Sequence, residues 1–262
     1  MSLSLDESIH IHWQGEGQPM LLLHGWGMNG QVFEPFAQLL AERGFRVGRV
    51  DLPGFGHSAP LSDGLTLEGI SQALAPLLPD ACVLVGWSLG GMAATRLALD
   101  CPERVSHLIT LASSPCFSAR DEWAGIKPRV LAGFAQALTQ DLAGTLERFV
   151  ALQAMGSDSA RKDTKAIRTL LSEAPEPDGS ALAQGLAILR DADLRPQLQN
   201  LSQPWLRLYG RLDALVPAES LPAMAALAPA SEQVVLPKAA HAPFISHPSD
   251  TLECIEAFLG RA

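Results

Sequence analysis

The stretch Gly86-Trp87-Ser88-Leu89-Gly90 places one serine between two glycines. An apolar run precedes it and small residues that can begin a helix follow it, so Ser88 falls where a strand turns into a helix. This is the G-x-S-x-G pattern of a nucleophile elbow. The serine backbone is strained in such a turn, flanking glycines avoid a Cβ clash, and the helix amino end points free N–H groups at the serine oxygen. The pattern predicts that Ser88 is a nucleophile.

A serine hydroxyl needs a base, and the base needs a carboxylate to orient it. In folds with this elbow the chain order is serine, acid, histidine, each in a loop that follows a strand. Asp213 in LYGRLDALVP directly follows one predicted strand, and His241 in LPKAAHAPFISHP follows another. We therefore predict that Ser88, Asp213 and His241 form a catalytic triad.

Other histidines and aspartates downstream of the serine are less well placed. His107 lies inside a strand pattern, and His247 precedes a proline, where capping of the last helix is the expected role. Asp191 and Asp193 come before the strand that Asp213 follows. A turn or helix-cap role for Asp213 is the alternative to the triad, because aspartate is common before a helix.

Acyl transfer also needs N–H donors for the developing oxyanion. One is expected from Leu89, the residue after the nucleophile, and one from an earlier loop between a strand and a helix. The segment LLLHGWGMNG supplies that loop and puts Trp26 at the donor position. We expect His24 to orient the loop through a hydrogen bond, and the Trp26 indole either to line the acyl pocket or simply to pack.

These residues must be positioned by alternating strands and helices. Near-continuous apolar strands separated by helices predict an α/β fold with a mainly parallel, twisted sheet covered on both faces. The expected strands are 9–13, 20–25, 45–54, 81–86, 105–113, 205–210 and 232–237. The expected helices are 32–43, 66–77, 90–100, 217–227 and 249–260.

The alternation stops between 116 and 200, where only helical patterns occur. EAPEPDGS (173–180) interrupts them with two prolines and a glycine. We predict a helical cap at 116–200, inserted into a hydrolase core formed by 1–115 and 201–262, over the sheet edge where ligands bind. Side chains at helical spacing in this insertion share one face: Leu142, Leu146, Phe149, Val150 and Gln153.

Composition narrows the class of protein. A chain of 262 residues, 47% hydrophobic and 18% charged, suits one sizeable domain, and its net charge of −9 argues against nucleic-acid binding. No apolar stretch is long enough for a membrane span, and the acidic start lacks the features of a signal peptide. Four scattered cysteines without a CxxC pair favour reduced thiols, so we expect a cytoplasmic protein. No His, Cys or Asp cluster has metal-ligand spacing, and no metal or cofactor is expected.

At this point the sequence resembles a known family, the pimeloyl-acyl-carrier-protein methyl ester esterases of biotin synthesis. The elbow and HGWG occur in many α/β-hydrolases, whereas SSPCFSARDEWAGIKP and ERFVALQ, in the expected cap, are more specific. The resemblance covers nearly the whole chain and implies a carboxylesterase with the triad predicted above. It also implies contacts to substrate at Trp26, Ser88, Leu89, Phe149, Val150, Ala151, Leu152, Gln153 and His241.

A basic stripe lies in the same region. The segment 148–168 contains five basic and two acidic residues, which gives it a local charge of +3 in an acidic chain. A solvated helix face is the usual meaning of such a stripe, but an acidic acyl-carrier protein bearing the pimeloyl methyl ester could dock on it. The docking candidates are Arg148, Arg161, Lys162, Lys165 and Arg168. We expect the enzyme to act as a monomer.

Three alternatives use the same scaffold. A general short-chain carboxylesterase or thioesterase would apply the triad to free esters, and a carbon–carbon bond hydrolase is a further relative. A ligand receptor would keep the triad but not depend on it. A dehalogenase is excluded, because that chemistry needs a carboxylate where Ser88 stands.

Overall fold

Residues 9–260 are the part of the chain that the computed structural model describes, and they form a seven-stranded sheet in the order β1-β3-β2-β4-β5-β6-β7. β1 runs antiparallel to β3, and the pairs β2–β3, β2–β4, β4–β5, β5–β6 and β6–β7 are parallel. The strands are β1 (Ile11–Gln14), β2 (Gln18–Leu23), β3 (Phe45–Val50), β4 (Cys82–Trp87), β5 (Val105–Leu111), β6 (Trp205–Gly210) and β7 (Glu232–Leu236). The predicted α/β class with a mainly parallel sheet is confirmed.

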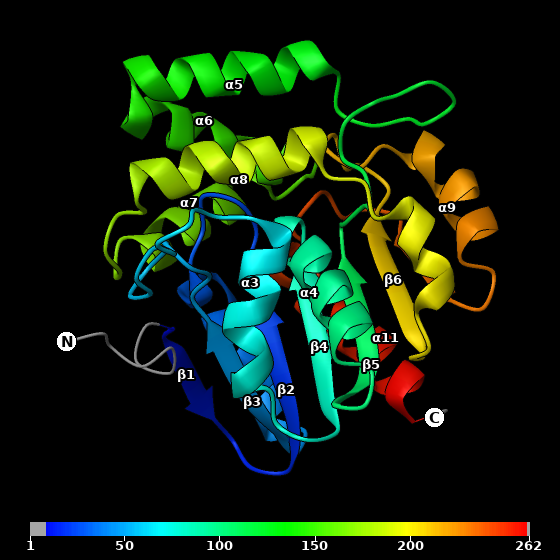
Figure 1. Cartoon of the computed structure of the whole chain (residues 1–262). Helices are drawn as coiled ribbons and strands as arrows, with labels where there is room; N and C mark the ends of the chain where they lie inside the picture. Colours follow the sequence, from blue (N-terminus) through cyan, green and yellow to red (C-terminus); the bar gives the residue numbers. More distant parts are fainter. Residues whose placement is uncertain (1–8, 261–262) are drawn as a thin grey trace.

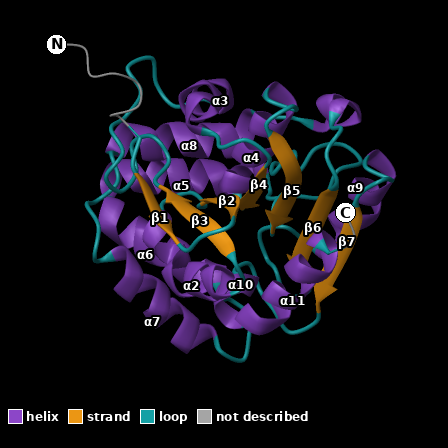
Figure 2. Cartoon of the chain, turned by 90° about the horizontal axis from the view of Figure 1, so that it is seen from below, coloured by secondary structure: helices purple, strands orange, loops and turns teal. Residues whose placement is uncertain are grey.

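Helices cover both faces of this sheet. Figure 2 shows α3 and α4 on one face and α2 and α11 on the other. The α-helices are α2 (Glu34–Glu42), α3 (Leu67–Leu74), α4 (Leu89–Asp100), α5 (Pro128–Gln140), α6 (Leu142–Gln153), α7 (Ala160–Leu171), α8 (Gly179–Asp191), α9 (Leu221–Leu227), α10 (Pro243–Ser246) and α11 (Pro248–Leu259). Short 3₁₀ helices are η1 (Gly30–Phe33), η2 (Ala75–Leu77), η3 (Arg195–Asn200) and η4 (Ala218–Ser220).

The helices α5 to α8 lie over the edge at which the parallel strands end (Figure 1). All four come between β5 and β6, where the sequence showed only helical patterns. The interruption at 173–180 covers most of the loop between α7 and α8 and the first two residues of α8. On α6, the predicted face is turned inward, since Phe149, Val150 and Gln153 are buried. The helices therefore form a layer above the sheet edge where the candidate residues gather.

Two sequence-based expectations concern the environment of the protein. Within residues 9–260, no helix is both long and apolar enough to span a membrane. The acidic start that argued against a signal peptide falls mostly on residues 1–8, which lie outside the described residues. Cys82, Cys101, Cys116 and Cys254 are free thiols, and burial raises the pKa of Cys82 to about 12.

His107 lies on β5, as its strand pattern predicted, and its ring packs edge-on against Phe258 of α11 with ring centroids 5.6 Å apart. Neither ring nitrogen has a hydrogen-bond partner among the described residues. Burial lowers the pKa of His107 below the ordinary value of 6.5. As the pH falls, the unfolded chain therefore protonates this side chain at a higher pH than the folded chain does.

This difference predicts that His107 makes the fold acid-sensitive. Stability should be lost as the pH falls below about 6.5, where the unfolded state binds the extra proton. We expect His107→Leu to change the free energy of unfolding at pH 8 by no more than about 1 kcal/mol, because both unpaired nitrogens are removed together. The same change should reduce the loss of stability between pH 7 and pH 5, measured by thermal unfolding. An unchanged pH dependence would contradict the assignment.

Candidate active site

The backbone at Ser88 has the strained conformation that the elbow pattern predicts. Its φ is 56° and its ψ is −121°, between the end of β4 and the start of α4. The Ser88 N–H donates to the carbonyl of Leu111 (3.0 Å), and the hydroxyl of Ser113 donates to the carbonyl of Ser88 (2.7 Å). Although Ser88 stands at the N-cap position, its side chain makes no capping bond. The Ser88 hydroxyl therefore makes no capping hydrogen bond to the backbone of α4.

The glycines around Ser88 are needed because other backbone lies against them. A Cβ on Gly86 would stand 2.5 Å from the Cα of Gly91, and one on Gly90 would stand 2.5 Å from the carbonyl oxygen of His24. A Cβ on Gly91 would collide with the side chain of Ser113. The elbow pattern explains Gly86 and Gly90 but not Gly91, because Ser113, which Gly91 contacts, is distant in sequence.

Asp213 and His241 form a buried pair. The Nδ1 atom of His241 lies 2.8 Å from Oδ2 of Asp213, and both side chains have 0% exposure. The other carboxylate oxygen accepts the backbone N–H groups of Leu215 (2.7 Å) and Val216 (3.0 Å). With every neighbour of the carboxylate donating, we assign the imidazole proton to Nδ1, which leaves Nε2 as an acceptor. Nε2 is buried and has no hydrogen-bond partner among residues 9–260, the Ser88 hydroxyl included.

The main chain of His241 is held by both the sheet and the helical layer. Its N–H donates to the carbonyl of Gln153 on α6 (3.0 Å), and its carbonyl accepts the indole N–H of Trp87 (2.7 Å). Trp87 immediately precedes Ser88, and its ring centroid lies 5.8 Å from that of His241. The elbow thus positions the histidine through its own neighbour, a role that the sequence did not reveal.

The loop expected to supply an oxyanion donor is hydrogen-bonded to the loop that follows β3. His24 donates from Nδ1 to the carbonyl of Gly25 (2.8 Å), and its Nε2 accepts the N–H of Leu52 (3.0 Å). Burial lowers the pKa of His24, so the ring stays neutral and can accept. Leu89 is the first residue of α4, where an N–H group has no acceptor within the helix.

The Trp26 indole joins this loop to the helical layer. Its N–H donates to the carbonyl of Leu182 on α8 (2.8 Å), and its ring packs edge-on against Phe149 with centroids 4.6 Å apart. It is not among the residues that line the cavity beside Ser88. Of the two roles considered for this side chain, the structure shows the packing contact.

A small apolar cavity of about 10 Å³ lies beside Ser88. Such a volume is comparable to the room for one water molecule. Apart from Ser88, its lining is hydrophobic and comes from residues 116–200, with one residue from the loop after β6: Phe117, Ile126, Val130, Leu131, Phe134, Phe149, Leu186, Leu189 and Leu215. The cavity suits a hydrocarbon chain in polarity but is nearly filled by side chains.

The other substrate contacts implied for α6 are distributed over different surfaces. Val150 lines a separate cavity of about 450 Å³, and Ala151 and Leu152 line an outer groove of about 480 Å³. Gln153 is buried and holds His241 through its carbonyl. Of these α6 residues, the structure brings only Phe149 into the cavity beside Ser88.

The outer groove between α6 and α7 is also lined by most of the basic stripe at 148–168. Four of the five docking candidates line it, together with Met155, whose exposure is 48%. These four are Arg148, Arg161, Lys165 and Arg168. Lys162 is exposed on the same helix but outside the groove lining.

The alternative acids and bases have other partners. Asp191 pairs with Arg190 (2.6 Å) and Asp193 with Arg195 (2.6 Å). His247 occupies the N-cap position of α11, as expected, but its ring contacts the hydroxyl of Ser246 instead of capping the helix. Three residues that sequence spacing did not group, His10, Asp51 and His57, lie close enough together to hold a metal ion.

Comparison with known proteins agrees with this architecture. Residues 18–248 match the family described as alpha/beta hydrolase fold. The chain is 53% identical to the pimeloyl-[acyl-carrier protein] methyl ester esterase of Aeromonas hydrophila subsp. hydrophila and 52% identical to that of Aeromonas salmonicida, each time over 97% of this chain and 100% of the relative. An esterase from Exiguobacterium antarcticum superimposes with a TM-score of 0.87 at 25% identity, covering 96% of this chain and 95% of that chain.

The chain therefore belongs to the α/β-hydrolase fold family. Its full-length relatives place it, within that fold, in the family of pimeloyl-[acyl-carrier protein] methyl ester esterases, which confirms the resemblance stated from the sequence.

The Trp87 contact predicts a positioning role that can be separated from stability. Trp87→Phe removes the donor to His241, so the histidine loop should shift and kcat for ester hydrolysis should fall roughly 10- to 100-fold. The buried carbonyl left unpaired should also cost about 1–3 kcal/mol of stability.

Trp205→Phe is the matched control, because that indole also makes a buried hydrogen bond, to Thr110 (3.0 Å), on strands away from the histidine loop. It should cost similar stability and leave kcat unchanged. Equal losses of kcat in the two variants would show that the Trp87 effect is only structural.

Proposed function

We propose that this chain is a serine carboxylesterase that removes the methyl group from pimeloyl-acyl-carrier-protein methyl ester in biotin synthesis. The observation that carries the proposed chemistry is the buried Asp213–His241 pair, anchored by Trp87 next to the strained Ser88. The substrate comes from the printed name of the full-length relatives.

In the first step the Ser88 oxygen attacks the ester carbonyl while Nε2 of His241 takes the hydroxyl proton. Asp213 keeps the imidazole in the required tautomer and stabilises its cation. The N–H groups of Trp26 and Leu89 receive the negative charge of the tetrahedral intermediate. The intermediate then releases methoxide, which leaves as methanol with the proton from His241.

In the second step water attacks the acyl-serine ester and gives a proton to His241. The bond from the acyl carbon to Ser88 breaks, and the proton returns to the serine oxygen. The product is the free carboxylic acid of the carrier-bound pimeloyl chain, which releases its proton to solvent and becomes the carboxylate. These steps balance without a metal or redox cofactor.

Substrate must enter through the helical layer. The cavity beside Ser88 has the apolar lining that a methylene chain prefers, but about 10 Å³ cannot hold it. Residues 116–200 therefore act as a cap in this proposal, and side chains of α5, α6 and α8 move apart when the acyl chain binds.

The basic groove between α6 and α7 is the proposed docking surface for the carrier protein. Its four cations stand out on a chain of net charge −9, so they would steer an acidic partner to this face. The exposed Met155 and the apolar floor give the partner a hydrophobic contact. We further propose that the enzyme works as a monomer in the cytoplasm.

Replacement of the nucleophile tests the chemistry. Ser88→Ala should reduce turnover of the carrier-protein methyl ester by roughly 10⁵-fold or more, and Asp213→Asn by about 10⁴-fold through the wrong imidazole tautomer. Thermal unfolding would show that each variant is folded. In a biotin auxotroph that lacks its own esterase, wild type should restore growth and Ser88→Ala should not. Turnover that survives Ser88→Ala would place the nucleophile elsewhere.

Charge reversal tests the docking surface. The double variant Arg161→Glu with Lys165→Glu should raise KM for the carrier-bound ester about tenfold and weaken its dependence on salt. Hydrolysis of a free p-nitrophenyl ester should be unchanged.

Arg129→Glu is the matched control, since Arg129 is an exposed cation on α5 outside the groove. Equal losses on both substrates, or the same loss with Arg129→Glu, would reject this surface. A wild-type enzyme that turns over the free ester as efficiently as the carrier-bound one would instead favour a general carboxylesterase.

A further inference from the structure

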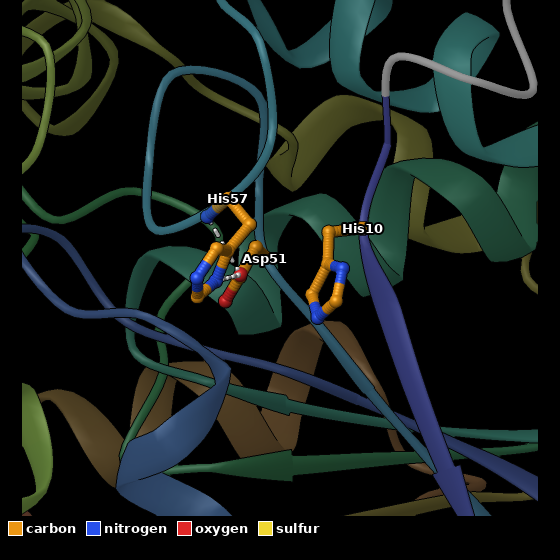
Figure 3. A group of neighbouring side chains, drawn as sticks. All are labelled: His10, Asp51 and His57. Atoms are coloured by element: carbon orange, nitrogen blue, oxygen red, sulfur yellow. Dashed lines mark hydrogen bonds and ion pairs between the residues drawn. The ribbon is translucent and has the colours of Figure 1, made fainter. Parts of the chain in front are cut away.

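Two histidines and a buried aspartate meet outside the Ser88 cavity. His10 precedes β1, Asp51 follows β3, and His57 lies in the turn beyond it. Their ligand atoms all lie within 4.8 Å of one another, and Figure 3 shows the Asp51 carboxylate between the two imidazole rings. Because His10 and Asp51 are 51 − 10 = 41 positions apart in the chain, no local spacing rule groups them.

The backbone around this cluster is fixed by a closed set of hydrogen bonds. The N–H of His10 donates to the hydroxyl of Ser58 (2.8 Å), and that hydroxyl donates to the carbonyl of Asp51 (2.6 Å). The N–H of Asp51 donates in turn to the carbonyl of His10 (3.0 Å). The positions of His10 and Asp51 relative to each other are therefore set before any ligand arrives.

The carboxylate is held in place but retains acceptor capacity. Oδ1 of Asp51 accepts the N–H of Gly30 (2.7 Å), and Oδ2 accepts the N–H of His57 (2.9 Å). Gly56 permits this arrangement, since a Cβ there would stand 2.5 Å from the carboxylate carbon. A carboxylate has about four lone-pair positions, so two remain for a further partner.

The spacing fits the coordination of a small divalent ion. Nδ1 of His57 lies 3.5 Å from Oδ2 of Asp51, close to the separation of about 3.4 Å between two ligands of a tetrahedral zinc ion. The rings of His10 and His57 have centroids 4.9 Å apart. The side chain of His57 is 45% exposed and that of His10 is also exposed, so both rings can turn inward and an ion can reach them from solvent.

We propose that His10, Asp51 and His57 form a binding site for a divalent transition-metal ion such as Zn²⁺. Imidazole with one carboxylate selects Zn²⁺, Ni²⁺ or Cu²⁺ over Mg²⁺ and Ca²⁺, which prefer oxygen ligands alone. Water completes the coordination, because three protein ligands leave a position open.

A positive charge beside the cluster lowers its affinity for a divalent cation. Arg49 and His12 line the same pocket, and the positive charge of Arg49 opposes a dication. Arg49 is buried, with one guanidinium N–H donating to the side chain of Gln31 (2.6 Å). The anionic Asp51 is the group that faces the ion directly.

A bound ion would join the first described strand to the 51–58 loop. The adjacent Leu52 donates to His24 in the expected oxyanion loop, so the cluster is connected to the frame of the active site. None of the three proposed ligands lines the cavity beside Ser88. The inferred role is therefore stabilisation, since a ligand that binds only the folded state shifts the unfolding equilibrium.

Titration of the tag-free, full-length protein with ZnCl₂ tests the site. Calorimetry should show one equivalent per chain, and Zn²⁺ but not Mg²⁺ should raise the melting temperature by several degrees. His10→Ala and His57→Ala should each weaken binding about tenfold or more and remove the thermal shift. Both keep the backbone N–H bonds described above, and melting in EDTA would show that their metal-free folds match that of wild type.

His12→Ala is the control, because His12 lines the pocket but is not in the proposed ligand set. It should retain binding within about threefold and keep the thermal shift. Absence of stoichiometric Zn²⁺ binding, wild-type affinity in the His10 or His57 variants, or an equal loss in His12→Ala would each overturn the assignment.

Discussion

A carboxylate and an imidazole shielded from water are the interaction on which the rest of the site depends. An unpaired charge in such a place is costly, but Asp213 is satisfied by two backbone N–H groups and by His241. The pair can then hold one imidazole nitrogen ready to accept a proton. Trp87 fixes the histidine from the sheet and Gln153 fixes it from α6, so the position of the base depends on both layers. Any movement of the helical layer that admits substrate is thereby coupled to the base.

Much of this arrangement could be predicted from local sequence. Strand patterns in the sequence predicted all seven strands, and apolar runs marked the central ones, β2 to β6, because strands covered on both faces are largely buried. The strained turn at Ser88 followed from its glycines, and the pairing of Asp213 with His241 followed from the rule that parallel strands end at the same edge of a sheet. Helical spacing also identified the buried face of α6.

Contacts between distant segments could not be predicted in this way. Periodicity showed that Phe149 and Val150 are buried, but not that they line different cavities. Nothing near Trp87 indicated that its indole would reach the carbonyl of His241. The cluster of His10, Asp51 and His57 was not predicted for the same reason, since the pairing of β1 with β3 is what brings these residues together. Side-chain direction and long-range pairing decide these cases, and both require coordinates.

The central claim is that Ser88 is a nucleophile activated by His241. Its most direct measurement is covalent labelling with a fluorophosphonate, followed by peptide mass spectrometry, because this reagent reports the activated oxygen without needing the natural substrate. The account predicts a single adduct on the peptide that contains Ser88, formed far more slowly in His241→Ala. An adduct on another residue, or labelling of Ser88 at an unchanged rate without the imidazole, would contradict it.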